Sequence, residues 1–483
     1  MKTNLFKLFF FLFFVASVQA QEETSFYATM DSEDARNLKI ELPNEVEIIA
    51  TEGNQSAVYI SRLATLEIQE ILSLHGPGYV FEPSLEKALI SIETEPLSNQ
   101  NKTVNFTITE DVLVNQALDM VDGDNIENDI LLLESYGTRY HTKASATQSV
   151  YDLKDKWEAM ALAAGRTDVS VRIFDHSGTN MPSVIMTIEG AETPDDYIII
   201  GGHMDSINQS NNDDAPGADD NASGIATITE ISRVLFDMDF VPKKTVEFMA
   251  FAAEEIGLVG SSEIAEEYNF NNINVEAFVQ FDMTNYAGST NDVYISTDSY
   301  TSSSLNTFLI DLIGHYNSSG DHQFTYGTTA CNYGCSDHFS WAQQGYDAAF
   351  PFEAAFGEHS PFIHSSQDLY IMMGTTEHAT KFAKLGVEFI IESAKGNVLS
   401  VNDYLNNKML MLVKDGQLTY RLIDLNDTIL EVSIYDISGK KIINQQSNQQ
   451  SGTISLQNLD SGFYIATFNF SKNGYMAKKF ILK

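Results

Sequence analysis

Hydrophobic and polar residues alternate in blocks between about residues 108 and 397, and the blocks predict strands followed by helices. Residues 197–200 form an apolar run that ends in two glycines, which is typical of a strand buried on both faces. Apolar residues then recur at helical spacing over 222–238. Further strands are expected over 245–253, 275–281, 293–296 and 348–352, and further helices over 259–268 and 305–316. This order predicts an α/β fold with a mostly parallel or mixed central sheet and helices on both faces.

Two regions on either side of this block have a different pattern. Residues 21–107 mix short strand-like runs with polar turns and contain no cluster of His, Cys and acidic residues. Residues 410–483, after a linker at about 396–409, hold short β-type runs separated by Gly, Asn and Asp. We therefore expect an N-terminal region, a catalytic domain over 108–397 and a small C-terminal all-β module.

Residues 1–20 have the pattern of a secretory signal peptide. Lys2 and Lys7 flank the start of an apolar run over 8–15, and Val18 and Ala20 are the small residues expected before a cleavage site. The apolar run is shorter than the ~20 residues that a membrane helix needs. The sequence therefore predicts an exported protein without a stable membrane span.

Composition excludes several classes of partner. The 483 residues include 28 Lys and Arg but 67 Asp and Glu, so the formal net charge is −39. Nucleic-acid binding needs clustered basic residues, which argues against it here. Hydrophobic residues make up 43% of the chain, enough for a sizeable core. We expect a soluble, acidic monomer.

Residues capable of metal binding follow three successive predicted strands. His203 and Asp205 follow the first, Glu254 and Glu255 the second and Asp282 the third. The carboxyl ends of strands in such sheets form ligand sites. Carboxylates that converge there repel one another, and divalent cations remove this repulsion. A ligand set of imidazoles and carboxylates without thiolates favours zinc in an open catalytic site, although manganese or cobalt could bind to the same donors.

Several motifs together resemble the secreted bacterial leucine aminopeptidases of the co-catalytic di-zinc peptidase family. They occur in one order along the chain, at 135–142, 201–206, 215–224, 252–258, 280–286 and 331–338, and end with His364. The resemblance covers about residues 131–389. It implies two zinc ions and the release of the first residue, preferably a large apolar one, from peptides or proteins.

The resemblance also implies individual roles. Asp219 is expected to bridge the two ions, and the Asp219–Asp220 peptide bond is expected to be cis, with Asp220 as a helix cap or loop residue. His203 and Asp282 are expected to bind one ion, and Glu255 and His364 the other. Asp205 is expected to orient His203, and Glu254 is expected to act as the general acid and base. Tyr333 is a candidate hydrogen-bond donor to the developing oxyanion.

The resemblance further implies that apolar residues near these motifs line the pocket for the first substrate residue. They are Met283, Phe352, Phe356 and Ile363, together with Cys331 and Tyr333, although each on its own is equally well explained as ordinary core. Cys331 and Cys335 are the two cysteines of an exported chain, which favours a small disulfide loop over free thiols, in agreement with the family.

The flanking regions carry weaker resemblances. Residues 432–440, 459–464 and 478–483 resemble the C-terminal sorting domain of the type IX secretion system, so its machinery is an expected partner and the cell surface or exterior the expected location. Residues 21–107 weakly resemble an N-terminal pro-region, and a permanent accessory domain is the alternative. The alternatives for function are a di-zinc carboxypeptidase or dipeptidase, or a non-catalytic relative.

Overall fold

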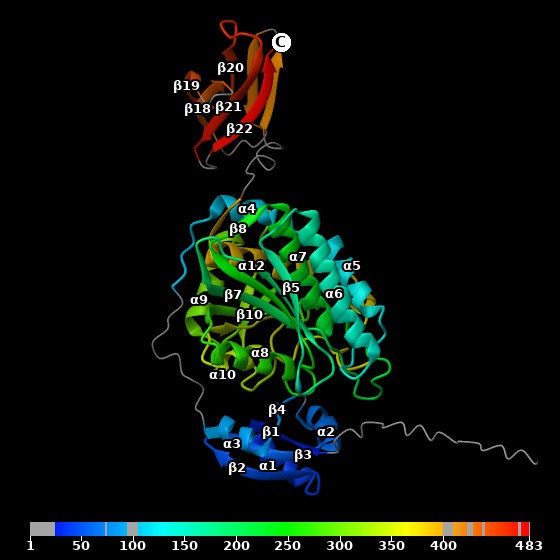
Figure 1. Ribbon diagram of the computed structural model, residues 1–483. Helices are drawn as coiled ribbons and strands as arrows, with labels where there is room; N and C mark the ends of the chain where they lie inside the picture. The colour runs from blue at the N-terminus through cyan, green and yellow to red at the C-terminus, as the bar shows by residue number, and fades with distance from the viewer. Residues whose placement is uncertain are drawn as a thin grey trace, which may run out of the picture.

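The computed structural model describes residues 25–72, 75–93, 105–398, 409–414, 416–422, 428–436, 440–471 and 475–482 (Figure 1). The expected signal peptide and residues 399–408 of the expected linker lie outside these ranges.

A six-stranded mixed sheet forms the centre of the largest part of the molecule. Four strands run parallel, and β6 and β5 add an antiparallel edge. The strand order is β13 (Ala348–Ala349), β10 (Asn274–Gln280), β7 (Thr193–His203), β9 (Lys244–Phe251), β6 (Ser183–Ile188) and β5 (Val169–Phe174). The predicted mixed α/β sheet is confirmed, and β7, β9 and β10 lie side by side in its centre.

Helices cover both faces of this sheet because its central strands are apolar on both faces. On β7, Ile198 and Ile200 pack into one core and Ile199 packs into the other. The first core is covered by α5 (Gly123–Glu134), α6 (Ala144–Ala163), α7 (Gly224–Asp237) and α12 (Glu377–Ala394). The second is covered by α8 (Val259–Phe270) and α10 (His338–Gln343).

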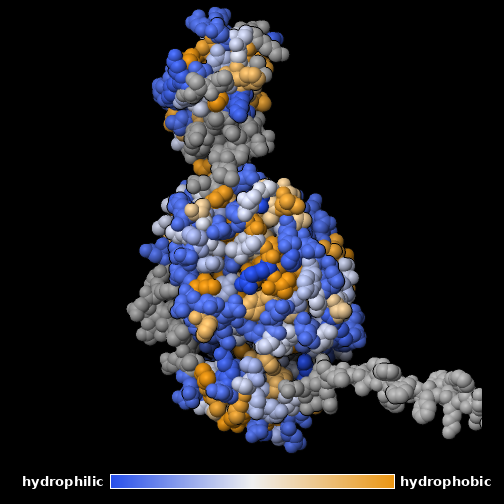
Figure 2. All heavy atoms as spheres, in the orientation of Figure 1, coloured by the Kyte–Doolittle hydropathy of each residue, from blue (hydrophilic) through white to orange (hydrophobic). Residues whose placement is uncertain are grey.

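Shorter elements complete this part. A three-stranded sheet has the order β12 (Tyr326–Thr329), β11 (Val293–Ser296) and β14 (Pro351–Phe352), and β8 (Phe240–Pro242) pairs with β15 (Gly396–Val398). The remaining helices of this part in the described residues are α4 (Asp111–Leu118), α9 (Ser303–Tyr316), the single turn α11 (Tyr370–Met373) and the short π-helix η1 (Ala218–Ser223). Figure 2 shows a mostly hydrophilic outer face with small apolar patches, as expected for a strongly acidic chain.

The N-terminal region folds into a small domain with its own core. Its antiparallel sheet has the order β2 (Val46–Glu52), β3 (Gln55–Ser61), β1 (Ser25–Asp31) and β4 (Val80–Glu82), and it carries α1 (Ser32–Glu41), α2 (Arg62–Leu72) and α3 (Leu85–Glu93). This domain lies against one end of the central part (Figure 1). Phe81 N donates to Gly257 O at 3.0 Å, and Lys87 Nζ lies 2.8 Å from a Glu266 oxygen.

The C-terminal residues form two antiparallel sheets around a separate apolar core, which includes Leu418, Val432 and Phe468. One sheet consists of β16 (Met409–Lys414), β17 (Gln417–Leu422) and β20 (Ser451–Ser455). The other has the order β19 (Lys441–Gln449), β18 (Ile429–Asp436), β21 (Gly462–Phe470) and β22 (Tyr475–Leu482). The expectation of an all-β module at this end is confirmed.

Candidate metal centre and active site

The ends of three neighbouring strands meet at one edge of the central sheet. His203 is the last residue of β7, and Asp282 follows β10 by two residues. After β9 ends at Phe251, the chain turns at Ala253, whose φ is 55°, and presents Glu254 and Glu255 to the same place. The turn lets two adjacent glutamates share one site, which a continued strand would prevent because successive side chains point to opposite faces.

Asp220, and not Asp219, lies between the two imidazoles of the site. Asp220 Oδ1 is 3.0 Å from His203 Nε2, and Asp220 Oδ2 is 3.1 Å from His364 Nε2. Asp219 instead accepts a hydrogen bond from Asn285 N at 3.2 Å. The cis peptide bond joins Asp220 to Asn221. The expected position of the cis bond is therefore wrong by one residue, and so is the placement of Asp219 between the histidines.

Contacts from distant parts of the chain decide which of the two aspartates faces the histidines. The carboxylate of Asp368 accepts hydrogen bonds from the backbone N–H groups of Asp219 and Asp220, at 2.9 and 3.0 Å. On the other side, Asn221 donates to Phe281 O and accepts from Gly224 N and Met283 N. Two identical neighbouring side chains carry no local signal that separates them.

Each imidazole also approaches a second carboxylate. His203 Nε2 lies 3.3 Å from Asp282 Oδ1, and His364 Nε2 lies 3.2 Å from Glu255 Oε2. These are the two pairs that the resemblance implies, and the structure brings both together around Asp220.

The donor atoms of this cluster fit divalent metal ions. His203 Nε2, His364 Nε2, Asp282 Oδ1 and both carboxylate oxygens of Asp220 and of Glu255 are buried, and in the described part of the chain none makes a hydrogen bond of acceptable geometry. Buried polar atoms without partners are costly. Donors that bind one tetrahedral zinc ion at 2.0–2.1 Å lie about 3.3 Å apart, close to the spacings found here. The residues around Asp220 therefore fit divalent cations.

Asp205 supports two of the strand ends at once. Its Oδ1 lies 3.4 Å from His203 Nδ1, on the side of the ring away from Asp220. The same carboxylate accepts from Glu254 N at 3.0 Å and from Glu255 N at 3.2 Å. Asp205 therefore lies where its expected role in orienting His203 requires.

Three supporting residues were not predicted. Asp368 holds the backbone of Asp219 and Asp220, and Ser336 Oγ donates to Asp282 Oδ2 at 2.6 Å. Buried Arg139 donates to the carbonyl oxygens of Leu133, Met204, Pro216 and Gly217, and so holds the loops around the site together. The motif at 135–142 contained Arg139, but nothing in it indicated this role.

The cluster attracts positive charge. Burial alone would raise the pKa of Asp220, but the close imidazoles of His203 and His364 hold that pKa well below its usual value. Burial would lower the pKa of His203, but Asp282 and Glu254 outweigh it and raise that pKa well above the ordinary range. Protons and metal ions therefore compete for the same imidazole nitrogens.

Glu254 differs from the other carboxylates of the site. Burial raises its pKa well above the usual value, Glu255, Asp337 and Asp282 add to this, and His203 opposes it. Its Oε1 is buried without a hydrogen-bond partner among the described residues. A carboxylate of raised proton affinity beside the donor cluster has the properties of a general base.

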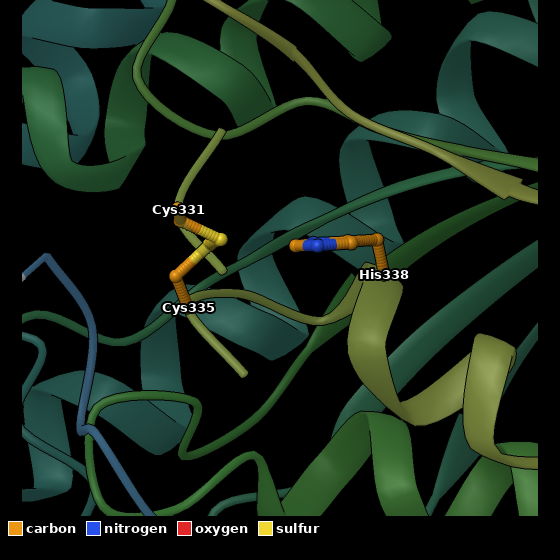
Figure 3. A group of neighbouring side chains, drawn as sticks. All are labelled: Cys331, Cys335 and His338. Atoms are coloured by element: carbon orange, nitrogen blue, oxygen red, sulfur yellow. A yellow bond between two sulfur atoms is a disulfide. The ribbon is translucent and has the colours of Figure 1, made fainter. Parts of the chain in front are cut away.

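The expected pocket residues pack together beside the cluster. Met283, Phe352, Phe356 and Ile363 belong to one apolar group, with Cys331, Tyr333, Cys335 and Phe350. The expected disulfide between Cys331 and Cys335 is confirmed (Figure 3). His338 points toward it, but sulfurs joined in a disulfide are not thiolates, so this group is not a metal site.

One more residue at the site comes from the N-terminal domain. The side chain of His75 is 1% exposed and lies among the apolar rings, with its ring centre 5.3 Å from that of Phe352. Its Nε2 is 3.7 Å from Asp282 Oδ2, and the hydroxyl of Tyr333 donates to the His75 carbonyl at 2.5 Å. Nothing in the sequence near His75 indicated a place in the site.

Comparisons with known proteins agree with this geometry. Residues 183–385 match peptidase family M28. A probable aminopeptidase of Saccharomyces cerevisiae is 32% identical over 59% of this chain and 76% of its own length. The chain belongs to peptidase family M28. This M28 peptidase is therefore a metal-dependent hydrolase that acts on peptide bonds.

Other relatives support the same assignment. Leucine aminopeptidase 1 of Paracoccidioides brasiliensis is 33% identical over 58% of the M28 peptidase and 73% of its own length. The Legionella pneumophila LapA aminopeptidase, whose crystal structure is known, is 30% identical in sequence to this chain and superposes with a TM-score of 0.66. The match covers 77% of this chain and 98% of LapA.

The C-terminal module of the M28 peptidase also matches a known family. Residues 416–483 match the secretion system C-terminal sorting domain, which supports export to the cell surface or the extracellular space. Among the described residues, no helix is both long enough and apolar enough to cross a membrane.

Proposed function

We propose that this chain is an exported aminopeptidase that binds two zinc ions and removes large apolar residues from the N-termini of peptides and proteins. One observation carries the proposal: the carboxylate of Asp220 faces His203 with one oxygen and His364 with the other. Asp282 and Glu255 add a second carboxylate to each imidazole. His203, Asp282 and Asp220 would hold one zinc ion, and His364, Glu255 and Asp220 would hold the other.

The side chains of the site have different roles in the proposed reaction. Zinc ions held by these residues would supply Lewis-acid chemistry, which polarises a scissile carbonyl and lowers the pKa of water toward about 7. Glu254 takes the proton from the attacking water and returns it to the leaving amine nitrogen. The hydroxyl of Tyr333, which donates here to a main-chain carbonyl, donates to the substrate oxygen as its negative charge grows.

The charges around the site favour a free amine over a free carboxylate. Glu254, Glu255, Asp220 and Asp282 surround the position where the first residue of a substrate would bind. A carboxypeptidase or dipeptidase would need a basic group there. Arg139 is close in space, but its guanidinium already donates to four main-chain carbonyls. We therefore favour the aminopeptidase over that alternative.

The apolar group beside the cluster supports the preference for a large apolar first residue. Met283 and Phe352 are fully buried, and Phe356 and Ile363 are partly buried against them. Such a pocket accepts Leu, Met or Phe, and it discriminates by about 1–3 kcal/mol per methylene. Export through the type IX machinery, with a signal peptide over 1–20 and residues 21–107 as a pro-region, completes the proposal.

Two neighbouring aspartates provide a matched test. Asp220→Asn should lose bound zinc, measured by elemental analysis of the purified full chain, whereas Asp219→Asn should keep it, because Asp219 contacts Asn285 and not the imidazoles. Hydrolysis of a leucyl anilide should follow the metal content, and an N-acetylated leucyl anilide should not be cleaved. Because His75 lies in the site, activity is measured after cutting at a protease recognition sequence inserted after Lys102 and removing the N-terminal domain.

Three results would contradict the proposal. They are equal zinc loss in both variants, hydrolysis of the acetylated substrate at the same rate, or no hydrolysis by cut protein that contains two zinc ions.

A further inference from the structure

Residues 75–79 form a buried connection of the N-terminal domain, and its first two residues, His75 and Gly76, reach the proposed active site. They connect α2 to β4, and all five are buried in a domain whose other loops face outward. His75 is 1% exposed and Tyr79 is 5% exposed. The N-terminal domain is therefore in contact with the part of the molecule that a substrate must reach.

The hydrogen bonding of His75 leaves one ring nitrogen available as a metal ligand. Its Nδ1 lies 3.0 Å from the carbonyl oxygen of Cys335, which can only accept, so the proton of the neutral ring is on Nδ1. Its Nε2 is buried and, among the described residues, has no hydrogen-bond partner. A histidine that donates from one nitrogen to a carbonyl and presents the other to carboxylates has the arrangement of a metal ligand.

The position of Nε2 places it with the donors of one ion and not the other. His75, Asp220 and Asp282 each offer an atom within 4.8 Å of the others. His203 Nε2 approaches the same two carboxylates, at 3.0 Å from Asp220 Oδ1 and 3.3 Å from Asp282 Oδ1. His75 Nε2, by contrast, lies 3.7 Å from the other Asp282 oxygen, Oδ2. His75 would thus be the fourth protein donor beside His203, Asp220 and Asp282. Catalytic zinc sites keep a position open for water or substrate, and four protein donors close it.

The rest of the segment occupies the space around that ion. The His75 ring lies 5.3 Å from the ring of Phe352 and 6.2 Å from that of Phe356, within the apolar pocket. The main-chain carbonyl of His75 accepts a hydrogen bond from the hydroxyl of Tyr333. A Cβ added to Gly76 would lie 3.3 Å from Glu254 Oε1, so the backbone of Gly76 packs against the proposed base.

We propose that His75 is a metal ligand of the intact chain. Through His75 the N-terminal domain takes the open coordination position of one ion and fills the pocket for the first residue, so the intact chain is an inactive precursor. This inference rests on the proposed function for the identity of the site. The segment takes up three positions that a substrate needs: the open coordination position of one ion, the pocket for the first residue, and the space beside Glu254. Removal of the domain reopens all three.

Metal coordination tests the ligand directly, without activity. The probe is cobalt(II), loaded into the metal-free full chain, because its visible absorption changes with the number and type of donors. His75→Phe keeps a ring in the pocket but removes both nitrogens. We expect the wild-type spectrum to change in His75→Phe, and we expect a chelator to remove one of two zinc ions about 10–100-fold faster from that variant. An unchanged spectrum together with unchanged metal release would overturn the proposal.

Two glycines provide a variant that keeps His75 and a matched control. Gly76 has φ +71°, and a Cβ there would meet the Cys335 carbonyl oxygen at 2.5 Å, so Gly76→Ala should lift the segment and change the cobalt spectrum as His75→Phe does. Gly53 in the same domain has φ +58°, but a Cβ there meets nothing within 4 Å. Gly53→Ala should therefore keep the wild-type spectrum. A Gly76→Ala spectrum identical to that of the wild type would count against the proposal.

Activity separates this proposal from the proposed function. A tethered segment competes at an effective concentration of the order of millimolar, so the intact chain should cleave a leucyl anilide about 10-fold or more slowly than the cut protein freed of its N-terminal domain. Equal rates before and after cutting would overturn the latency and leave the aminopeptidase intact. If the cut protein with both ions cleaves nothing, the proposed function fails, while the cobalt spectra still decide whether His75 is a ligand.

Discussion

The carboxyl edge of the central sheet and the segment 75–79 contribute to the same site by different routes. His203, Glu255 and Asp282 follow adjacent strands, so the sheet itself brings them together. His75 comes from another domain and reaches Asp282 because that domain docks on the central part, through contacts that include Phe81 with Gly257 and His75 with the Cys335 carbonyl. Residues at strand ends can be found from local patterns, whereas a residue delivered by domain docking cannot.

The two routes also differ in how strongly they should affect chemistry. In our proposal, side chains at the sheet edge support the reaction and the segment from the N-terminal domain obstructs it. Removing a group from the edge should therefore lower activity, and loosening the N-terminal domain should raise it. The three predictions below probe the two regions, two at the sheet edge and one in the N-terminal domain, from the largest expected effect to the smallest.

Glu254→Gln should cause the largest loss. Gln cannot accept the proton from water, and loss of a general acid–base group typically costs about 100- to 10,000-fold in rate. The metal content should stay at the wild-type value, because Glu254 is not one of the residues that approach the imidazoles within 3.3 Å. The measurements are kcat on a leucyl anilide and elemental analysis of the cut protein. Exposed Glu267 provides the control Glu267→Gln; a wild-type rate in Glu254→Gln would show that the base is another group.

Asp205→Asn should have an intermediate effect on metal affinity. The carboxylate orients His203 and accepts from the N–H groups of Glu254 and Glu255, so its loss loosens two strand ends together. Changes to groups that orient metal ligands typically reduce affinity by about 10–100-fold. Competition with a chromogenic chelator measures the effect. Asp195→Asn, at the exposed opposite end of β7, should have none, and equal affinity in both variants would remove Asp205 from the support of the site.

Glu82→Gln should have the smallest effect, confined to the N-terminal domain. Burial raises the pKa of the Glu82 carboxyl to about 7, above the value of the unfolded chain, so the folded state holds the proton more tightly. Its contribution to stability is present at pH 4 and is lost as the pH rises toward 7. At pH 8, Gln should therefore stabilise this domain by about 3 kcal/mol.

Hydrogen exchange of the amides in β1–β4 at pH 5 and pH 8, corrected for intrinsic rates, measures this stability. Protection should fall with pH in the wild type but not in Glu82→Gln, while the strands of the central sheet keep theirs in both. Exposed Glu86 provides the control Glu86→Gln. A wild-type loss of protection in Glu82→Gln would assign the pH dependence to another group.

Much of the fold was predictable because hydrophobic periodicity reports burial directly. The apolar run at 197–200 became the centre of β7, and the helical spacing over 222–238 became α7. The antiparallel strands β5 and β6 at the edge of the sheet were not predicted. Their residues pair with each other and with β9, and that pairing depends on which strands happen to be neighbours.

The site was predictable to within one residue at its centre. His203, Glu254, Glu255, Asp282 and His364 meet where the order of motifs implied. Asp219 and Asp220 are chemically identical in the sequence, and only the hydrogen bonds to Asp368 and Asn221 select which carboxylate turns toward the histidines. A difference of one position in a turn reverses the direction of a side chain, and local composition does not record it.

The amino-acid sequence by itself determined the class of fold, the donor types at the strand ends and the acidic character of the surface, because these depend on residue type and short-range spacing. Tertiary structure alone decided that Asp220 faces both imidazoles and that His75 lies beside Asp282 and Phe352, because both depend on contacts between segments far apart in the chain. Asp368 lies 148 positions from Asp220, and His75 lies 260 from Cys335, whose carbonyl orients its ring. Distances of that kind become short only when the whole core has packed.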